Sequence, residues 1–332
     1  MSAHTETGNE EKGPVVRNEE GRPLVSVVIP TYGRNEHLPE AVASVAEQTY
    51  DAIELCIVDD GSPTPVSETL PESSVESIES VTFVRHGENR GANAARNSGI
   101  RTARGSYVAF LDDDDYWHET KISRQVDAFE TGPSEVGVVY TGKRAEGPDG
   151  VTVTTPTAEG NVIRDLLSGE SFGQFSSVMV RADVIDAAGL TDERFPAWQD
   201  REWFFRLAQH CHFTPIPETL TYRRVGLPDS ITKKFEQKRD VAYPLFVEKH
   251  YPFAREYGRY YARTFLASLR TSLARSAVTA GRYREARKYF WLAFSANPLY
   301  RPAHLHLLPS LGGKWTYQPA AFIRRVAVKG NI

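Results

Sequence analysis

Short apolar runs alternate with amphipathic stretches along the first 117 residues of the chain. The stretch 35–48 places Leu38, Val42 and Val45 on one face of a helix, and 89–105 also has helical character. The apolar runs, which are typical of strands, are 24–30, 53–62, 81–86 and 107–115. Strands that alternate with helices predict βαβ units and a parallel sheet. Because the runs are almost continuously apolar, we expect both faces of that sheet to be covered.

Polar side chains gather where three of these predicted strands end. They are Thr31, Tyr32 and Arg34 after the first strand, Asp59 and Asp60 at the end of the second, and Asp112, Asp113, Asp114 and Asp115 at the end of the fourth. Open α/β sheets bind ligands at the carboxyl ends of their strands. A ligand site is therefore predicted at this edge, although a polar turn is the alternative for any single position.

The pattern changes after Tyr140. Residues 141–161 are rich in Gly, Thr and Pro and predict a loop or hairpin, and 176–189 predict a strand that leads into a helix. Residues 194–210 predict a loop that becomes a helix around Asp200, so that this carboxylate lies near a helix N-terminus, where negative charge is favoured. From about Tyr257 the chain is expected to form consecutive helices, one of which resembles a single tetratricopeptide-type repeat.

Charge divides the chain unevenly. The net charge is −4 over 332 residues. Residues 255–332 hold fourteen Lys or Arg and two acids, a net of +12, so residues 1–254 carry −16. We expect a polar tail at 1–22, a large domain at 23–250 and a basic, aromatic-rich helical region at 251–332. Two cysteines, a polar N-terminus and the lack of an 18-residue apolar window favour a reducing, cytoplasmic setting.

The four consecutive carboxylates of Asp112–Asp115 require compensation. Two like charges about 4 Å apart repel by ~4 kcal/mol at an effective dielectric near 20. If the strand continued through them, Asp112 and Asp114 would share one face, and such a pair of oxygen ligands suits Mg²⁺ or Mn²⁺ with a diphosphate. A solvated acidic turn or a Ca²⁺ loop is the alternative.

The segments VSVVIPTYGRNEHLPEAVASVAEQTYDAIELCIVDDGS, ENRGANAARNSGIRTARGSYVAFLDDDDYW and WQDREWFFRL together resemble the inverting glycosyltransferase family 2, of GT-A fold. The resemblance covers roughly residues 23–230. It implies an α/β fold with a mostly parallel sheet flanked by helices, followed here by the C-terminal helical region. It also implies that residues 23–250 form the nucleotide-sugar-binding catalytic domain. It also implies a nucleotide-diphosphate sugar, linked to UDP or GDP, as the donor, and a glycan or lipid-linked acceptor.

The resemblance further assigns roles to single residues. It places Pro30, Thr31, Tyr32 and Arg34 around the nucleotide base, Asp60 on the base with Asp59 beside it, Arg96 near the phosphates, Asp113 on the ribose or diphosphate, Asp114 on the metal and Asp112 as a second metal ligand. Turn formation by Asp59 and Asp60 and a solvated helix face for Arg96 are the alternatives.

Asp200 matches the general base of the family. The family usually has Glu-Asp at this point, and this chain has Gln199-Asp200. The departure concerns the acid before the base, so the base itself is not in doubt. The missing acid affects the expected contacts with the acceptor. Capping of the helix is the alternative role for Asp200. Arg223 and Arg224 are candidates for closing over the diphosphate, although the usual His is absent from 221–232.

The basic C-terminal region leaves two interpretations open. Its charge and aromatic residues suit peripheral contact with an anionic membrane, at the inner face of the cell membrane, or packing against the acidic remainder of the chain. Nucleic acid is not expected as a partner, because no binding motif accompanies the charge. For the whole chain, the alternatives to a transferase are a nucleotidyltransferase and a non-catalytic sugar-nucleotide-binding module. The first would have a Gly-rich basic loop after the first strand, and the second would lack the base.

Overall fold

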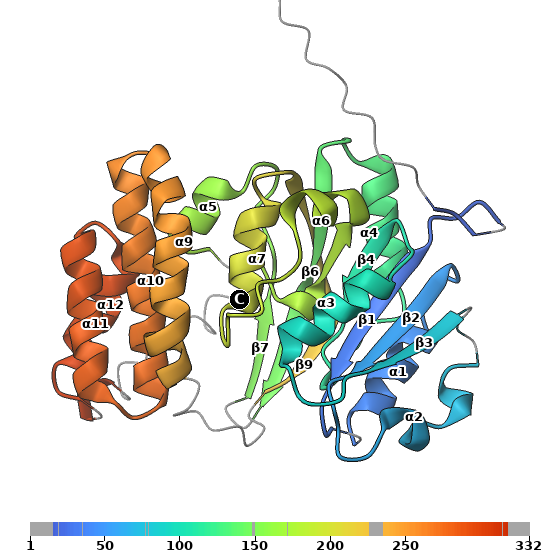
Figure 1. Cartoon of the computed structure of the whole chain (residues 1–332). Helices are drawn as coiled ribbons and strands as arrows, with labels where there is room; N and C mark the ends of the chain where they lie inside the picture. Colours follow the sequence, from blue (N-terminus) through green and yellow to red (C-terminus); the bar gives the residue numbers. More distant parts are fainter. Residues whose placement is uncertain are drawn as a thin grey trace, which may run out of the picture. The chain divides into compact units, whose positions relative to one another are not determined.

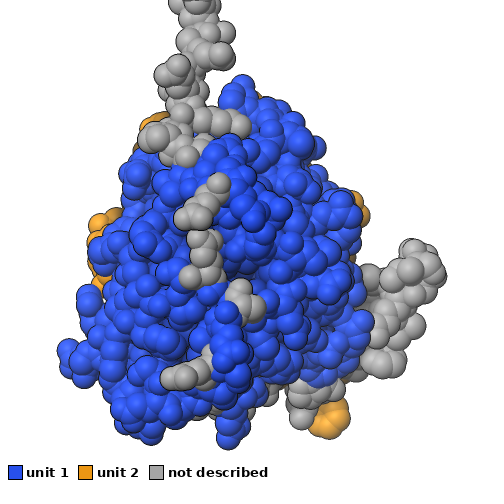
Figure 2. All heavy atoms as spheres, turned by 90° about the vertical axis from the view of Figure 1, so that its right-hand side faces the viewer, with its two compact units in different colours: residues 1–160, 173–191, 206–225 blue, residues 161–172, 192–205, 226–332 orange. Residues whose placement is uncertain are grey.

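The computed structural model describes residues 16–317 except 19, 35, 77, 79, 148, 149, 171, 226–234 and 314. The chain divides into two compact units (Figure 2). Unit 1 comprises residues 1–160, 173–191 and 206–225, and unit 2 comprises residues 161–172, 192–205 and 226–332. Most of the predicted N-terminal tail and the end of the C-terminal region, with Phe322, lie outside the described residues.

Unit 1 is built on a mixed sheet of nine strands within the described residues, in the order β3-β2-β1-β4-β8-β6-β9-β5, with β7 paired to β6 (Figure 1). The first four strands pair in parallel, as predicted, and the pairs β4·β8, β6·β8, β6·β7 and β5·β9 are antiparallel. The strands are β1 (Val25–Thr31), β2 (Ile53–Asp59), β3 (Ser80–Arg85), β4 (Tyr107–Phe110), β5 (Asp115–Trp117), β6 (Val136–Gly147), β7 (Gly150–Thr154), β8 (Val178–Arg181) and β9 (His212–Arg224).

Helices cover both faces of the parallel part of this sheet. Val25, Val27 and Ile29 alternate along β1 and pack in one apolar cluster with helices α1 (Leu38–Ala46) and α4 (Lys121–Thr131). On the other face, helix α3 (Ala92–Thr102) contacts β1 so closely that a Cβ on Gly99 would lie 2.2 Å from Val28 Cγ1. The expectation of a sheet covered on both sides is confirmed for β1, β2 and β4, whose residues are buried throughout. The edge strand β3 departs from it, because Phe83 is 42% exposed.

Polar groups buried at the start of these strands are also paired. Glu54 on β2 is 3% exposed and accepts hydrogen bonds from Ser26 Oγ at 2.5 Å and from Arg104 Nε at 2.8 Å. These bonds tie β2 to β1 and to the turn before β4. A buried carboxylate is tolerated here because charged and polar donors satisfy it.

The remaining elements of the described chain are short in unit 1 and long in unit 2. Unit 1 also contains α2 (Val66–Thr69), η1 (Glu72–Ser74), η2 (Phe175–Ser177) and α6 (Ala182–Ala188); unit 2 contains α5 (Ile163–Ser168), the π-helical η3 (Lys238–Ala242), α9 (Tyr243–Glu256), α10 (Arg259–Thr279), α11 (Tyr283–Ala296) and α12 (Arg301–Ser310). Helix α7 (Gln199–Leu207) begins in unit 2 and ends in unit 1. The predicted strand-to-helix segment and the hairpin at 141–161 are both present, as β8-α6 and β6-β7.

The consecutive helices predicted after Tyr257 are confirmed (Figure 1). In α11 the residues Ala286 and Phe290 are fully buried and pack with Leu273 of α10, so the predicted apolar stripe faces a neighbouring helix. None of the helices in the described part of the chain is both long enough and apolar enough to cross a membrane.

The two units do not coincide with the division predicted after residue 250. Residues 161–172, 192–205 and 235–250 group with the C-terminal helices rather than with the sheet. Sequence order alone does not reveal this grouping, because short segments leave the sheet region and return to it. The assignment of residues 23–250 as the catalytic domain stays a prediction.

Candidate functional site

The order of the strands creates a switch point between β1 and β4. From β1 the chain moves outward through β2 to β3, and then returns to place β4 on the other side of β1. The loops that leave β1 and β4 therefore diverge from a common edge, which is where open α/β sheets bind ligands. Thr31 ends β1, and Asp112–Asp114 follow β4, so the sheet brings these polar residues together.

Thr31, Arg34, Asp113 and Asp114 form a connected cluster at this edge. Thr31 Oγ1 donates to Asp113 Oδ2 at 2.7 Å. Arg34 Nη1 donates to Asp113 Oδ1 at 3.1 Å and to Asp114 Oδ2 at 2.7 Å. Burial raises the pKa of Asp113 to about 6, although the bond from Thr31 and the charge of Arg34 oppose this shift. The cluster joins residues about 80 positions apart.

Arg96 forms a second ion pair beside this cluster. Its Nη2 donates to Asp112 Oδ1 at 2.5 Å, and its guanidinium carbon lies 3.9 Å from the centroid of the Phe175 ring. Arg96 is 5% exposed, so the alternative of a solvated helix face is wrong, and its predicted place near the phosphates stays a prediction. Its Nε and Nη1 atoms are buried and have no hydrogen-bond partner within the described residues. A buried guanidinium with two unused donors is suited to an anionic ligand.

Asp115 has a different environment from the three acids before it. It begins β5, is 3% exposed, and its Oδ2 accepts from Gln174 Nε2 at 2.9 Å and from Ser176 Oγ at 2.6 Å. Arg223, its register partner on β9, lies 3.7 Å away. Burial raises the pKa of Asp115 to about 7, and the charge of Asp112 adds to this effect. Asp115 is therefore a buried structural carboxyl group.

These contacts correct the expected geometry of the acidic run. Strand β4 ends at Phe110, so Asp112–Asp114 are not extended and the prediction that Asp112 and Asp114 share one face is wrong. Asp113 and Asp114 instead turn toward the same arginine, Arg34. The arginines that pair with the four carboxylates lie far from them in the sequence, so the local sequence pattern does not predict these ion pairs.

Asp59 and Asp60 are buried and bonded within unit 1. Asp59 accepts from Ser62 N at 2.8 Å and pairs with Arg85, its register partner on β3. Asp60 accepts from Arg90 N at 2.9 Å and Gly91 N at 2.7 Å, and it contacts His86 Nδ1 at 2.7 Å. The two carboxylates thus hold the loops that follow β2 and precede α3. Arg85 and His86 end the neighbouring predicted strand, and that position could have signalled the pairing.

The remaining predicted residues of unit 1 differ in exposure. Pro30 is buried within β1 opposite Val58, whereas Tyr32 is half exposed just beyond the strand. Arg224 pairs with Glu40 of helix α1, and its guanidinium lies 5.6 Å from the Tyr116 ring. The roles of these side chains in binding a nucleotide stay predictions. The part of the segment 221–232 beyond Val225 lies outside the described residues.

Sequence reasoning missed one fully buried amine in unit 1. Lys121 begins α4, and its Nζ donates to Gln125 Oε1 at 2.6 Å and lies 3.9 Å from the Trp117 ring centroid. Burial lowers the pKa of Lys121 well below its usual value. The amide of Gln125 in turn donates to Val139 O at 2.8 Å, so the group links α4 to the sheet. A lysine at the start of a helix carries no sequence signal for such burial.

Asp200 belongs to unit 2, near the start of α7 as predicted. Trp198, two residues earlier, has a φ of 58°, which is rare for a residue with a side chain, and it packs against Phe246 of α9. Asp200 is partly exposed, and its Oδ1 accepts from Arg201 N at 2.7 Å. A backbone held in this region at a helix start is a common feature of functional sites.

Glu202 fixes the same helix to α9. It is 1% exposed and accepts from Lys249 Nζ at 2.7 Å and from His250 Nε2 at 3.2 Å. Lys249 also donates to Asp192 at 2.9 Å. The first turn of α7, which carries Asp200, is therefore anchored by a buried carboxylate with two donors.

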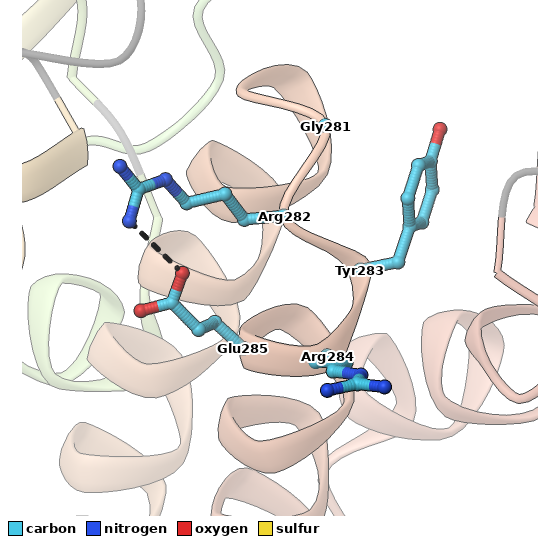
Figure 3. Close-up of a pocket in the computed structure, with 5 residues that line it drawn as sticks. All are labelled: Gly281, Arg282, Tyr283, Arg284 and Glu285. Carbon is cyan, nitrogen blue, oxygen red and sulfur yellow. Dashed lines mark hydrogen bonds and ion pairs between the residues drawn. The ribbon is translucent and has the colours of Figure 1, made fainter.

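A surface hollow of about 520 Å³ lies elsewhere in unit 2, at the start of α11 (Figure 3). It is lined by Gly281, Arg282, Tyr283, Arg284 and Glu285. Arg282 Nη1 donates to Glu285 Oε2 at 3.4 Å across it, whereas Tyr283 points away from this pair. The hollow is open to solvent and contains none of the predicted site residues.

Comparison with known proteins identifies the sheet region. The model of the family described as glycosyl transferase family 2 matches residues 26–186. Residues 26–186 belong to glycosyl transferase family 2. This family 2 region contains the switch point between β1 and β4 with Thr31, Arg34, Arg96 and the acidic run, and it ends before α7.

Curated relatives are similar to this family 2 region and its surroundings. An uncharacterized glycosyltransferase of Haemophilus influenzae is 29% identical over 203 residues, which are 60% of this chain and 67% of the relative. The putative teichuronic acid biosynthesis glycosyltransferase TuaG of Bacillus subtilis is 39% identical over 107 residues, and the Escherichia coli UDP-Glc:alpha-D-GlcNAc-diphosphoundecaprenol beta-1,3-glucosyltransferase WfaP is 37% identical over 108. The matches with TuaG and WfaP cover 32% of this chain and 42% of each relative.

Solved structures share the fold of the family 2 region and of much of the remaining chain. Staphylococcus aureus TarS 1-349 in complex with UDP has a TM-score of 0.53 at 15% identity, covering 84% of this chain and 91% of that one. The mannosyltransferase PcManGT of Pyrobaculum calidifontis, in complex with GDP-Man and Mn²⁺, has a TM-score of 0.55 at 18% identity, covering 96% and 91%. The likeness confirms the predicted fold class: α/β of GT-A type with a helical C-terminal region.

Two carboxylates of the family 2 region, those of Asp112 and Asp114, could each contribute an oxygen ligand to a divalent cation. Among the described residues, groups of three or more His, Cys, Asp or Glu suited to a metal are absent. Asp112 and Asp114 are each partly exposed, with 28% and 20% of the side chain accessible. Because Mg²⁺ and Mn²⁺ retain waters and accept phosphate oxygens, two carboxylates are a sufficient protein contribution.

Proposed function

We infer that this chain is an inverting glycosyltransferase. It would move a sugar from a UDP- or GDP-linked donor to a hydroxyl group of a glycan or lipid-linked acceptor. The observation that carries the inference is the cluster at the switch point of the family 2 region, where Thr31, Arg34 and Arg96 meet Asp112–Asp114. The names of the similar proteins, which include a UDP complex, a GDP-Man complex and a glucosyltransferase, agree with a nucleotide-sugar donor.

In the proposed reaction the Asp200 carboxylate takes the proton of the acceptor hydroxyl. The acceptor oxygen then forms a bond to the anomeric carbon while the bond from that carbon to the diphosphate oxygen breaks. The electron pair of the broken bond leaves with the diphosphate, and the single displacement inverts the anomeric configuration. A positioned base of this kind contributes about 10²–10⁴-fold in rate.

The leaving diphosphate gains negative charge as this bond breaks, and the proposed role of the cluster is to stabilise that charge. Arg34 and Arg96 are the proposed donors to phosphate oxygens, and two nitrogen atoms of Arg96 lack hydrogen-bond partners within the described residues. Asp112 and Asp114 would hold Mg²⁺ or Mn²⁺, which supplies additional positive charge at the diphosphate when bound. Donors that are fixed before the reaction lower its barrier most effectively.

The test compares Asp200→Asn with the wild-type chain. We expect the variant to bind UDP or GDP unchanged and to lose at least ~10²-fold in sugar transfer, because only the proton acceptor is removed. Asp186→Asn on α6, which removes an exposed carboxylate, is the control and should transfer normally. Unchanged turnover of Asp200→Asn would refute the assignment of the base.

A screen of nucleotide sugars by thermal shift, combined with identification of the released products, separates the other candidate functions. A non-catalytic binding module would show ligand-induced stabilisation without product formation by the wild-type chain. A nucleotidyltransferase would instead release pyrophosphate from a nucleoside triphosphate and a sugar phosphate. The proposed transferase is expected to release UDP or GDP.

A further inference from the structure

Large apolar side chains are exposed on helices α11 and α12 and on the segments that follow each of them. Trp291 lies on α11, Leu299 in the connection, Leu308 near the end of α12, and Leu311 and Trp315 beyond it. Leu299 is 78% exposed, Leu308 72% and Trp315 89%. These five residues are called the α11–α12 face. Contiguous exposed apolar residues of this size mark interaction sites.

The geometry of α12 separates this face from the packed side of the helix. Ala303 and Ser310 are fully buried. Leu308 lies five residues after Ala303, which is a rotation of about 140° around an α-helix. Leu308 therefore points away from the packed side and is exposed because of its position. Leu311 has helical φ and ψ as the C-cap, so it continues the same surface.

Contacts between α11 and α12 make the face continuous. Arg287 of α11 donates from Nη1 to Leu311 O at 2.9 Å. The rings of Trp291 and Phe294 lie 5.7 Å apart, and Phe294 lies 5.1 Å from the ring of His304 on α12. These contacts place the apolar residues of α11 next to those of α12, and Arg287 lies among them.

Basic residues surround this face, and acidic residues are missing from the sequence around it. The chain contains no Asp or Glu after Glu285, a stretch of 47 residues that holds seven Lys or Arg. Arg284 and Lys288 on α11 and Arg301 at the start of α12 are exposed. Exposed leucine and tryptophan with surrounding cations and without anions are the composition of an interfacial membrane-binding surface.

We propose that the α11–α12 face binds the surface of an anionic lipid bilayer, with its leucines and tryptophans in the interfacial layer and its basic residues on the head groups. The same positive charge on a second copy of the chain would repel it, which disfavours self-association through this face. Nucleic acid would satisfy the charge but would leave the exposed leucines without apolar contact. The proposal is independent of the transfer reaction.

The test is flotation of the full-length chain with vesicles. Vesicles that contain phosphatidylglycerol and phosphatidylcholine should carry the wild-type chain upward, and vesicles of phosphatidylcholine alone should carry much less. The double variant L308S/L311S should bind the anionic vesicles about 100-fold more weakly, which corresponds to roughly tenfold for each leucine withdrawn from the interface. High salt should weaken wild-type binding.

The matched control is V151S/V153S, which removes two exposed apolar side chains from β7 in unit 1 and should float like the wild type. In addition, bromine-labelled lipids should quench the wild-type tryptophan emission, and W291F/W315F should remove most of that quenching. Equal flotation of L308S/L311S and the wild type, or absence of quenching, would overturn the proposal. So would a lipid-free dimer that L308S/L311S dissociates, or RNA binding without vesicle binding.

Discussion

Replacement of Glu202 by Gln removes the charge that anchors the first turn of α7. In the wild-type chain, Lys249 Nζ and His250 Nε2 both donate to Glu202, whose side chain is 1% exposed. Both donors contact the same oxygen, Oε1, so an amide that places its oxygen there keeps both contacts but removes the negative charge. Two charge-assisted hydrogen bonds then become ordinary ones inside the protein, which costs more than the same change in a surface pair.

The magnitude follows from the exposure of the partners. Hydrogen bonds to a charged group contribute about 1.5–3 kcal/mol each and neutral ones about 0.5–1.5 kcal/mol, so each of the two bonds weakens by about 1–1.5 kcal/mol. Lys249 is 28% exposed and keeps Asp192 at 2.9 Å, so its loss is partly compensated. His250 is 4% exposed at the side chain and is not relieved by solvent. The free energy of unfolding of unit 2 is therefore expected to fall by ~2–3 kcal/mol.

Urea denaturation followed by tryptophan emission measures this change. Four of the five tryptophans of the chain, Trp198, Trp203, Trp291 and Trp315, lie in unit 2, so the emission reports mainly on that unit. Glu248→Gln removes an exposed carboxylate from the same helix, α9, and should alter stability by less than about 0.5 kcal/mol. If Glu202→Gln and Glu248→Gln unfold at the same urea concentration, the argument from the buried carboxylate fails.

Three further predictions concern acid stability, the sheet and the metal. The bond with Arg194 holds the pKa of Asp192 below its usual range, so the ionised carboxylate stabilises the fold at neutral pH, and this stabilisation is lost as the pH falls below the ordinary value of 3.8. Between pH 6 and pH 3, the free energy of unfolding of Asp192→Asn should therefore fall less than that of the wild type. Equal losses of the two proteins in denaturation would count against this. Glu54→Gln should lower the free energy of unfolding by ~2 kcal/mol, because the carboxylate accepts Arg104 Nε at 2.8 Å, and a neutral outcome would contradict the assigned bond. Asp114→Ala should abolish Mn²⁺-dependent binding of UDP or GDP in calorimetry, whereas tight wild-type binding in chelator would argue against a metal site.

The strands and helices around the switch point could be predicted from local pattern. The runs that became β1, β2 and β3 and the helix that became α1 have the apolar spacing of their final structures. The end of β4 at Phe110 was not predictable in this way, because the following residue, Leu111, is as apolar as the strand and the turn depends on contacts of the acidic side chains.

The candidate site was predicted as a set of residues but not as a set of contacts. Position after a strand was enough to select Thr31, Arg34 and the acidic run, since parallel strands end at one edge. The pairing of Arg34 with Asp113 spans 79 residues, and the burial of Arg96 depends on Phe175, which no pattern near Arg96 indicates. Such pairings depend on tertiary structure, which sequence spacing does not encode.

If the switch point binds the proposed donor, its arginines would couple the binding of the nucleotide to that of the cation. Because Arg34 already shares its charge with Asp113 and Asp114, a bare divalent cation gains little by approaching these acids and must compete with a guanidinium. An incoming diphosphate offers that guanidinium a new partner and leaves a carboxylate available to the cation. Nucleotide and cation would thus enter together as one complex, and each alone would be retained poorly.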